Sequence, residues 1–181
     1  MQDDKITESV QNWMETFIIE LNLCPFAKKE LVDNKVLFTV TDAKTEDQLL
    51  ESLQTELERL NNNASIETTL LIHPQVLQDF YEYNQFLSLA DCLLLDLNLA
   101  GIYQIASFHP DYQFSGTNPD DVENYTNRSP FPMLHLLRED SLEKAIGKYP
   151  NVDQIPVRNI ELMKSIGRDK LNLALENCLV K

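Results

Sequence analysis

The sequence predicts an α/β fold: a sheet of about four strands, mostly parallel with one antiparallel strand, flanked by helices. Between residues 35 and 108, short runs of aliphatic and β-branched residues alternate with longer segments in which apolar side chains recur every three or four positions. This alternation is typical of βαβ crossovers, which make successive strands parallel. A last apolar run follows a long segment rich in turn-forming residues, and we expect it to return as the antiparallel strand.

Length and composition favour a single domain covering residues 1–181. A chain of 181 residues is the size of one ordinary domain, and no repeat, low-complexity tract or linker interrupts it. No apolar run approaches the roughly 20 residues that span a bilayer, and the acidic N-terminus does not resemble a secretory signal. Three widely spaced cysteines suggest neither a disulfide framework nor a zinc site. We therefore expect a soluble cytoplasmic protein without a membrane partner.

Charge argues against nucleic acid as a partner. The formal net charge is -14, and no lysine or arginine occurs between Arg59 and Arg128. Because affinity for nucleic acid depends largely on cations that displace counterions from phosphates, such a chain repels that ligand.

Helix and strand signals alternate through the first part of the chain. Apolar residues at helical spacing predict a helix over residues 7–21, and residues 35–40 are predicted to form a strand. Thr45 and Gln48 form a capping box that opens a leucine-rich helix ending before the asparagines at 61–63.

The middle of the chain repeats this order. A strand is predicted over residues 66–72, followed by a long helix that Gly101 would terminate in a left-handed conformation. Residues 102–108 are predicted to form the third strand, and residues 133–138 the fourth, after a long ordered loop at 111–132. The remaining residues are predicted to be helical.

The unusual residues are the three histidines. His73 and His109 each end a predicted strand and precede a proline, which stops the strand. Parallel strands share one carboxyl edge, where open α/β sheets bind ligands, so the two imidazoles should lie together there. An antiparallel fourth strand would bring His135 to the same edge, whereas a parallel one would move it away. A group of neutral imidazoles suits general acid/base chemistry or metal binding, although no close histidine spacing supports a metal site. The alternative is that these are strand-end histidines whose hydrogen bonds are satisfied within the protein.

Cys24 is the candidate nucleophile. It precedes Pro25, a residue suited to the first helical position, so its thiol should lie at a helix N-terminus that favours a thiolate. The ordinary role of a free cysteine, a small buried apolar group, is the alternative.

Charged and polar residues near the long loop are candidates for substrate binding. The guanidinium of Arg128 could bind a carboxylate or phosphate, with Asn127 as a further donor, or could instead neutralise acidic residues of the loop. Arg138 is a second candidate, for which a structural role is simpler. Asp111 could orient the His109 imidazole if the turn after it allows, and Tyr112 is a weaker candidate.

Three segments carry a family resemblance: residues 21–27 (LNLCPFA), 103–112 (YQIASFHPDY) and 125–139 (YTNRSPFPMLHLLRE). They resemble the bacterial family called domain of unknown function 1415, and the similarity covers nearly the whole chain. The resemblance implies one domain of similar length. It implies no activity, cofactor or catalytic residue.

Two functional hypotheses follow. The first is a small-molecule enzyme of hydrolase or transferase type, acting on an anionic small molecule in a pocket of histidine, cysteine and arginine at the carboxyl edge of the sheet. The second is a non-catalytic metabolite-binding or protein-interaction subunit. An enzyme should place these side chains around one concave pocket, whereas an interaction subunit should scatter them. The sequence leaves the cofactor and the oligomeric state open.

Overall fold

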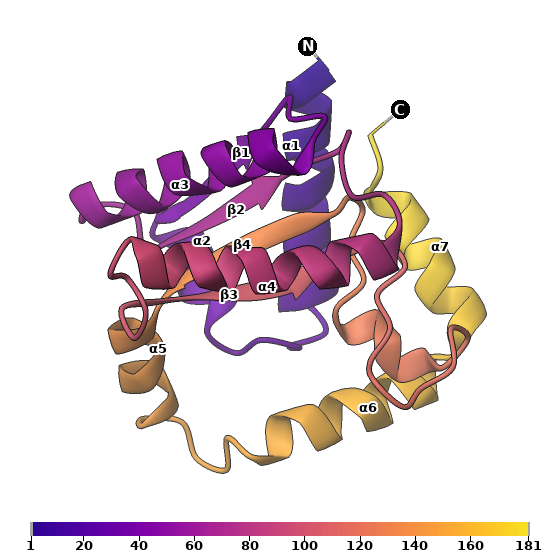
Figure 1. Ribbon diagram of the computed structural model, residues 1–181. Helices are drawn as coiled ribbons and strands as arrows, with labels where there is room; N and C mark the ends of the chain where they lie inside the picture. The colour runs from indigo at the N-terminus through magenta and orange to yellow at the C-terminus, as the bar shows by residue number, and fades with distance from the viewer. Residues whose placement is uncertain (1, 181) are drawn as a thin grey trace.

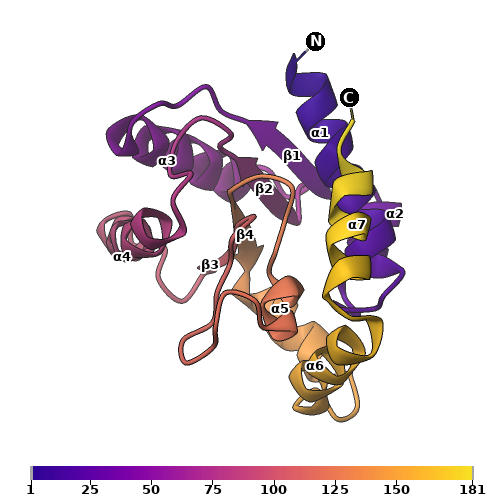
Figure 2. The ribbon, with the colours of Figure 1, turned by 90° about the vertical axis from the view of Figure 1, so that its right-hand side faces the viewer.

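The computed structural model describes residues 2–180 and contains a four-stranded sheet between two layers of helices (Figures 1 and 2). The strands are β1 (Val36–Val40), β2 (Thr68–Ile72), β3 (Tyr103–Phe108) and β4 (Met133–Arg138). Their order across the sheet is β1-β2-β4-β3. The strands predicted from the sequence are all present, with ends that differ by two residues or fewer.

The sheet is mixed, and the prediction of a mostly parallel sheet needs correction. Strand β1 pairs with β2 in parallel, but β4 lies between β2 and β3 and is antiparallel to both. Strands β1, β2 and β3 do run in one direction, as the crossovers require. The alternation of strands and helices along the chain predicts the direction of each strand but not which strands pair. The insertion of β4 between β2 and β3 could therefore not be predicted from it.

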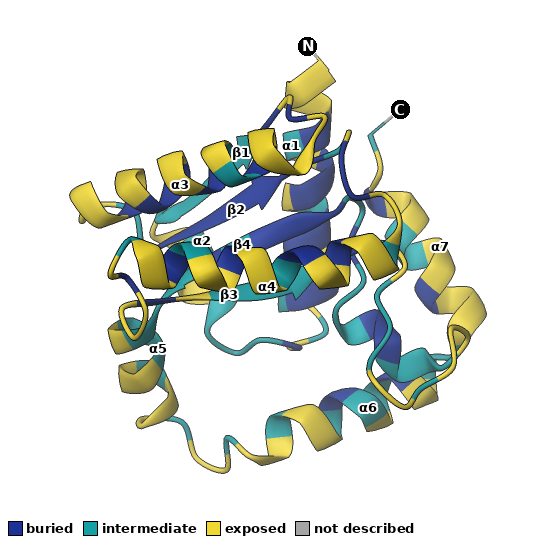
Figure 3. Ribbon diagram, viewed as in Figure 1, coloured by how far each residue is buried: buried dark blue, intermediate teal, exposed yellow. Residues whose placement is uncertain are grey.

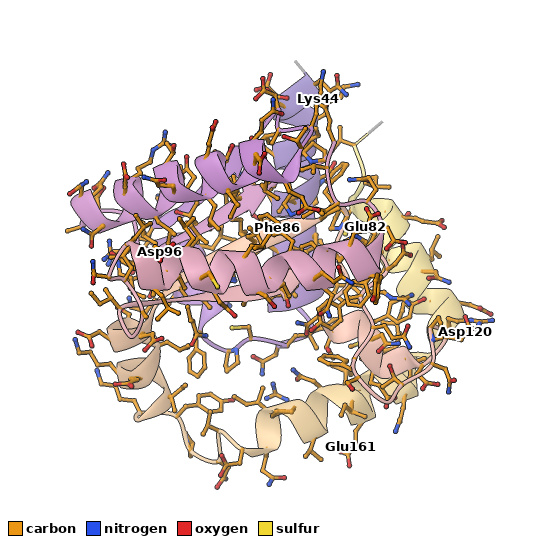
Figure 4. The ribbon with its side chains drawn as sticks, in the orientation of Figure 1. Lys44, Glu82, Phe86, Asp96, Asp120 and Glu161 are labelled. Atoms are coloured by element: carbon orange, nitrogen blue, oxygen red, sulfur yellow. The ribbon has the colours of Figure 1, made fainter. Side chains whose placement is uncertain are left out.

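One face of the sheet, here called the first face, is covered by α3 (Glu46–Asn62) and α4 (Phe80–Asp96). The N-cap of α3 is Thr45, whose side chain accepts a hydrogen bond from the Gln48 amide, as predicted. Both helices turn apolar side chains to the sheet. In α4, Phe86 is buried, whereas Glu82 and Asp96 near its ends are exposed (Figure 4).

Helix α4 ends before the predicted glycine. Its C-cap is Leu97, and Asn98 adopts the left-handed conformation with φ 57°. Asparagine is one of the few residues other than glycine that tolerates this region. Gly101, also left-handed at φ 78°, belongs instead to the turn that leads into β3.

The opposite face, the second face, is covered by α1 (Gln2–Trp13), α2 (Ala27–Val32) and α7 (Arg168–Cys178), as Figure 2 shows. Near this face also lie α5 (Glu139–Ile146) and α6 (Gln154–Ile166). The first predicted helix starts earlier than expected, because Asp3 and Asp4 suit the first turn of a helix. After Trp13 it continues as a π-helix, η1 (Met14–Ile19), which widens the turn.

Side chains alternate between the two faces along each strand. Strand β2 is buried on both sides (Figure 3), with Leu71 in the core of the first face and Leu70 and Ile72 in that of the second. The loop at residues 111–132 contains a short 3-10 helix, η2 (Val122–Thr126). Within residues 2–180, no helix combines the length and the apolar character needed to cross a membrane.

Candidate functional site

A cavity of about 640 Å³ lies over the second face of the sheet. Its floor is formed by side chains of β2, β3 and β4, and its walls come from α1, η1, the segment before and within α2, η2, α5 and α6. A volume of this size suits a small organic ligand. Most of its surface is apolar, with contributions from Trp13, Ile18, Leu70, Phe108, Leu142 and Ile160.

His135 is the polar group on the cavity floor. It is the third residue of β4 and lies opposite Leu70 of β2, so its ring projects from the second face. The Thr68 hydroxyl lies 2.7 Å from Nε2 of His135 and 2.7 Å from the Leu136 carbonyl oxygen. A carbonyl can only accept, so the single hydroxyl proton of Thr68 goes to Leu136. Thr68 must then accept from Nε2–H of His135, which leaves Nδ1 unprotonated.

The Nδ1 atom of His135 has no hydrogen-bond partner among residues 2–180, and its ring borders the cavity. Burial lowers the pKa of His135 to about 4, because a charged imidazole would lose its hydration. The ring is therefore neutral at physiological pH. It offers a lone pair in a mainly apolar space.

Two glutamates stand at the end of the cavity where β1 and β2 begin. One carboxylate oxygen of Glu30 (Oε2) and one of Glu67 (Oε1) are buried without a hydrogen-bond partner in the described chain. The Glu67 and Thr68 amides both donate to the Lys35 carbonyl, at 2.9 and 3.4 Å. Two successive amides that share one acceptor, as in a β-bulge, interrupt the alternation of side chains between the two faces of the sheet. The side chains of Glu67 and Thr68 therefore both border the cavity.

Cys24 lines the same cavity, beside the start of α2. Burial raises the pKa of its thiol, while the nearby backbone amides of Phe26 and Ala27 act in the opposite direction. Burial is the larger effect, so the thiol stays protonated at neutral pH. No hydrogen bond between Cys24 and His135 exists in the described structure, and a nucleophile with its base would need one.

His73 and His109 are indeed close together, at the carboxyl ends of β2 and β3. Both are fully buried, and both rings lie against Tyr83 of α4, with ring centroids 5.7 and 5.1 Å from the tyrosine ring. They belong to the first face and do not line the cavity on the second. The expected convergence of all three histidines is therefore wrong for His135, because alternation along β4 turns its ring to the opposite face.

The hydrogen bonds of these two imidazoles are made within the protein. The Nδ1–H group of His73 donates to the Val76 carbonyl at 3.0 Å. In His109, Nε2–H donates to the Leu77 carbonyl at 3.2 Å, and Nδ1 accepts from the Asp111 amide at 3.0 Å. Desolvation lowers the pKa of His73 to about 4 and also lowers that of His109. Both rings are neutral and hold the turns that follow their strands.

Asp111 therefore contacts His109, but through its backbone. Its amide rather than its carboxylate reaches the ring, and the carboxylate is near enough to raise the pKa of His109 slightly against the larger effect of burial. Tyr112 packs against Phe80 and Phe114 and does not line the cavity.

The two candidate arginines bind backbone oxygens. The guanidinium of Arg128 donates to the carbonyls of Tyr112 and Pro119 and lies over the Tyr125 ring, which ties the long loop together. Arg128 does not line the cavity, whereas its neighbour Asn127 does while donating to the Ser107 carbonyl.

Arg138 borders the cavity, but its guanidinium turns toward the first face. There it donates to the carbonyls of Leu60, Asn63 and Ile66 and to the Tyr103 hydroxyl. It thus satisfies oxygens left free at the C-terminal end of α3.

Within residues 2–180, no three histidine, cysteine or acidic side chains lie close enough together to hold a metal ion. The candidate site comprises His135 with Thr68, Cys24, Glu30 and Glu67. Apolar side chains form most of the remaining lining, together with Glu123, Asn127, Arg138, Ser141 and Asn159.

Comparison with known proteins identifies the family. The family model described as "Protein of unknown function (DUF1415)" matches residues 5–173. This chain belongs to the DUF1415 family. No curated protein and no solved structure matches it. The resemblance noted in the three sequence segments is confirmed, and the cavity described above lies within the matched region of this DUF1415 protein.

Three cavity residues, Glu30, Glu67 and Thr68, were not among the candidates from the sequence. For Glu30 there is a signal, since Ala27, Glu30 and Leu31 share one face of a short helix and place a carboxylate among apolar residues. Glu67 enters the cavity only because of the bulge at the start of β2. Thr68 matters through its pairing with His135, which depends on the order of strands in the sheet.

The hydroxyl of Tyr83 holds the strand ends beside the two buried histidines. It donates to the Met133 carbonyl at 2.8 Å and accepts from the Phe108 amide at 3.1 Å. We expect Tyr83→Phe to lower the free energy of unfolding by about 3 kcal/mol, because it leaves a buried carbonyl and amide unpaired. Urea denaturation measures the change. Tyr81→Phe, at an exposed position, is the control, and equal midpoints for both variants would contradict the assignment.

Proposed function

We propose that this protein is an enzyme that acts on a small molecule in the cavity of the second face, with Nδ1 of His135 as the general base. In this proposal His135 removes a proton from the attacking group. That group is water in a hydrolysis, or a hydroxyl or amine of the substrate in a group transfer. As the new bond forms, the bond to the leaving group breaks, and the proton held on Nδ1 passes to the leaving group.

The observation that carries the proposal is the hydrogen-bond chain from His135 through Thr68 to the Leu136 carbonyl. This chain specifies which nitrogen carries the proton and holds the ring in one orientation, as the partners of catalytic histidines do. It leaves the acceptor nitrogen facing a space of ligand size. The low pKa keeps that nitrogen unprotonated across the physiological range and also makes it a weaker base than an ordinary imidazole.

In this proposal Cys24 binds the substrate and is not the nucleophile that the sequence suggested. Its protonated thiol is a weak hydrogen-bond donor on the cavity wall, suited to orient a substrate. An anionic substrate is not favoured, because the Arg128 guanidinium is engaged outside the cavity and Glu30 and Glu67 border it.

A metabolite-binding protein is the second candidate. It is favoured by the largely apolar lining, by the missing contact between Cys24 and His135, and by the position of His73, His109 and Arg128 outside the cavity lining. Under this alternative, His135 would simply accept a hydrogen bond from the bound molecule.

A turnover assay separates the two. The purified protein is incubated with a defined library of small metabolites, and consumption of each compound is followed by mass spectrometry. We expect at least one compound to be converted, and His135→Gln to slow that conversion by about 100-fold or more, the usual contribution of a general base. Thr68→Val, which removes the partner of Nε2, should slow it by a smaller factor.

Lys44→Gln serves as the matched control, because Lys44 is exposed and far from the cavity lining (Figure 4). Conversion that persists unchanged in His135→Gln would disprove the role of His135. Compounds that bind saturably without conversion would favour the binding protein.

A further inference from the structure

We infer that the molecule bound in this cavity carries an ammonium group on an apolar body, and that Glu30 and Glu67 bind the ammonium. This inference names the ligand class of the site and rests on the proposed function only in using the same cavity.

The two carboxylates reach the same end of the cavity from different segments. The Lys35 amide donates to the Glu30 carbonyl, and the Lys35 carbonyl accepts from the Glu67 amide, each at 2.9 Å. Both glutamates line the cavity. Oε1 of Glu30 accepts from the Lys29 ammonium at 3.2 Å, but Oε2 of Glu30 and Oε1 of Glu67 are buried with no partner among the described residues. A buried acceptor without a donor is costly, so a ligand that donates hydrogen bonds there would be stabilised.

The remaining polar groups of the cavity do not supply that donor. No lysine lines it within residues 2–180, and each nitrogen of the Arg138 guanidinium already donates to a protein oxygen. The side-chain amides of Asn127 and Asn159 donate to the carbonyls of Ser107 and Leu23. Of the other groups on the lining, Nδ1 of His135 is an acceptor, whereas the Cys24 thiol and the Ser141 hydroxyl are uncharged donors. Acceptors and negative charge therefore dominate the polar part of the site.

Position links this subsite to His135. Glu67 directly precedes Thr68, and Thr68 holds the His135 ring. A molecule anchored at Glu67 by its ammonium group would place its next atoms toward Nδ1 of His135. Its apolar part would then lie against the rings of Trp13 and Phe108.

The test uses three probes with the same phenyl ring and different polar ends: 2-phenylethylamine, which is cationic at neutral pH, 2-phenylethanol and phenylacetate. Binding to the full chain is measured by isothermal titration calorimetry. We expect the cationic probe to bind about tenfold or more tightly than either other probe, as a charged hydrogen bond to a buried carboxylate should provide. In the Glu30→Gln/Glu67→Gln double variant this preference should fall to about parity.

Glu161→Gln is the matched control, since Glu161 is exposed on the outer side of α6 (Figure 4) and should leave the preference unchanged. Circular dichroism establishes that each variant is folded, and the single substitutions Glu30→Gln and Glu67→Gln are measured if the double variant is not. Tighter binding of phenylacetate, no saturable binding of 2-phenylethylamine at millimolar concentration, or a preference that survives in the glutamine variants would each overturn the inference.

These outcomes are distinct from a failure of the proposed function. The probe preference depends on the carboxylates and is expected to persist in His135→Gln. The loss of turnover, by contrast, depends on His135. An ammonium preference without any turnover would therefore leave a binding protein for amines.

Discussion

The free energy of unfolding should fall steeply as the pH is lowered from about 6.5 to about 4. His73 and His135 are the cause, because burial lowers the pKa of each to about 4 in the folded protein, against 6.5 for an ordinary histidine. If either folded ring took up a second proton, the new N–H group would find no hydrogen-bond acceptor among residues 2–180. Nε2 of His73 is buried without a partner, and Nδ1 of His135 has none within the described chain.

The sign follows from where the protons bind. Below about pH 6.5 the histidines of the unfolded chain take up protons, while those of the folded protein stay neutral until about pH 4, so acid favours the unfolded chain. The stabilisation is complete above the unfolded pKa and is lost as the pH falls toward the folded value. Each histidine should contribute a slope of about 1.4 kcal/mol per pH unit, and about 3 kcal/mol over the whole interval.

Urea denaturation at a series of pH values measures this slope. His73→Asn keeps a donor for the Val76 carbonyl but removes the titrating group. It should therefore reduce the slope of the unfolding free energy against pH by about 1.4 kcal/mol per pH unit. Any loss of stability that is the same at every pH shifts the whole curve and does not change its slope. A flat profile in the native protein, or an unchanged slope in His73→Asn, would contradict the burial of a neutral imidazole.

Replacement of Trp13 by alanine should lower the free energy of unfolding by about 3–5 kcal/mol. Trp13 is 1% exposed and packs edge-on against Phe108 of β3, with ring centroids 5.2 Å apart. Its Nε1–H donates to the Arg128 carbonyl at 3.0 Å, which joins the first helix to the long loop. Alanine would remove both contacts and enlarge the cavity that Trp13 lines.

Circular dichroism is the suitable probe for this denaturation, because Trp13 is the single tryptophan of the chain and its fluorescence is lost in the variant. Trp13→Phe should recover part of the loss, since it restores an aromatic ring but not the hydrogen bond. Tyr81→Ala, at a position 71% exposed, should change stability by about 0.5 kcal/mol or less. Equal effects of the tryptophan and tyrosine substitutions would contradict the packing described here.

Much of the local structure could be predicted from the sequence. The capping of α3 by Thr45, the ends of β2 and β3 at His73 and His109, and the helices after β4 depend on periodicity and on residues next to one another in the chain. The meeting of His73 and His109 could also be predicted, because parallel strands share one edge. Local backbone geometry governs the helix cap, the strand ends and the helices. The meeting of the two histidines follows instead from the parallel direction that helical crossovers impose on β2 and β3.

The candidate site was decided by the tertiary structure. The sequence by itself determined that His135 lies near the start of a strand, but not that β4 inserts between β2 and β3. That insertion places Thr68 beside His135, while strand alternation turns the ring away from the other two histidines. The bulge that brings Glu67 into the cavity and the packing that surrounds it likewise depend on residues far apart in the chain. Contacts of this kind are set by long-range packing, which local sequence patterns do not encode.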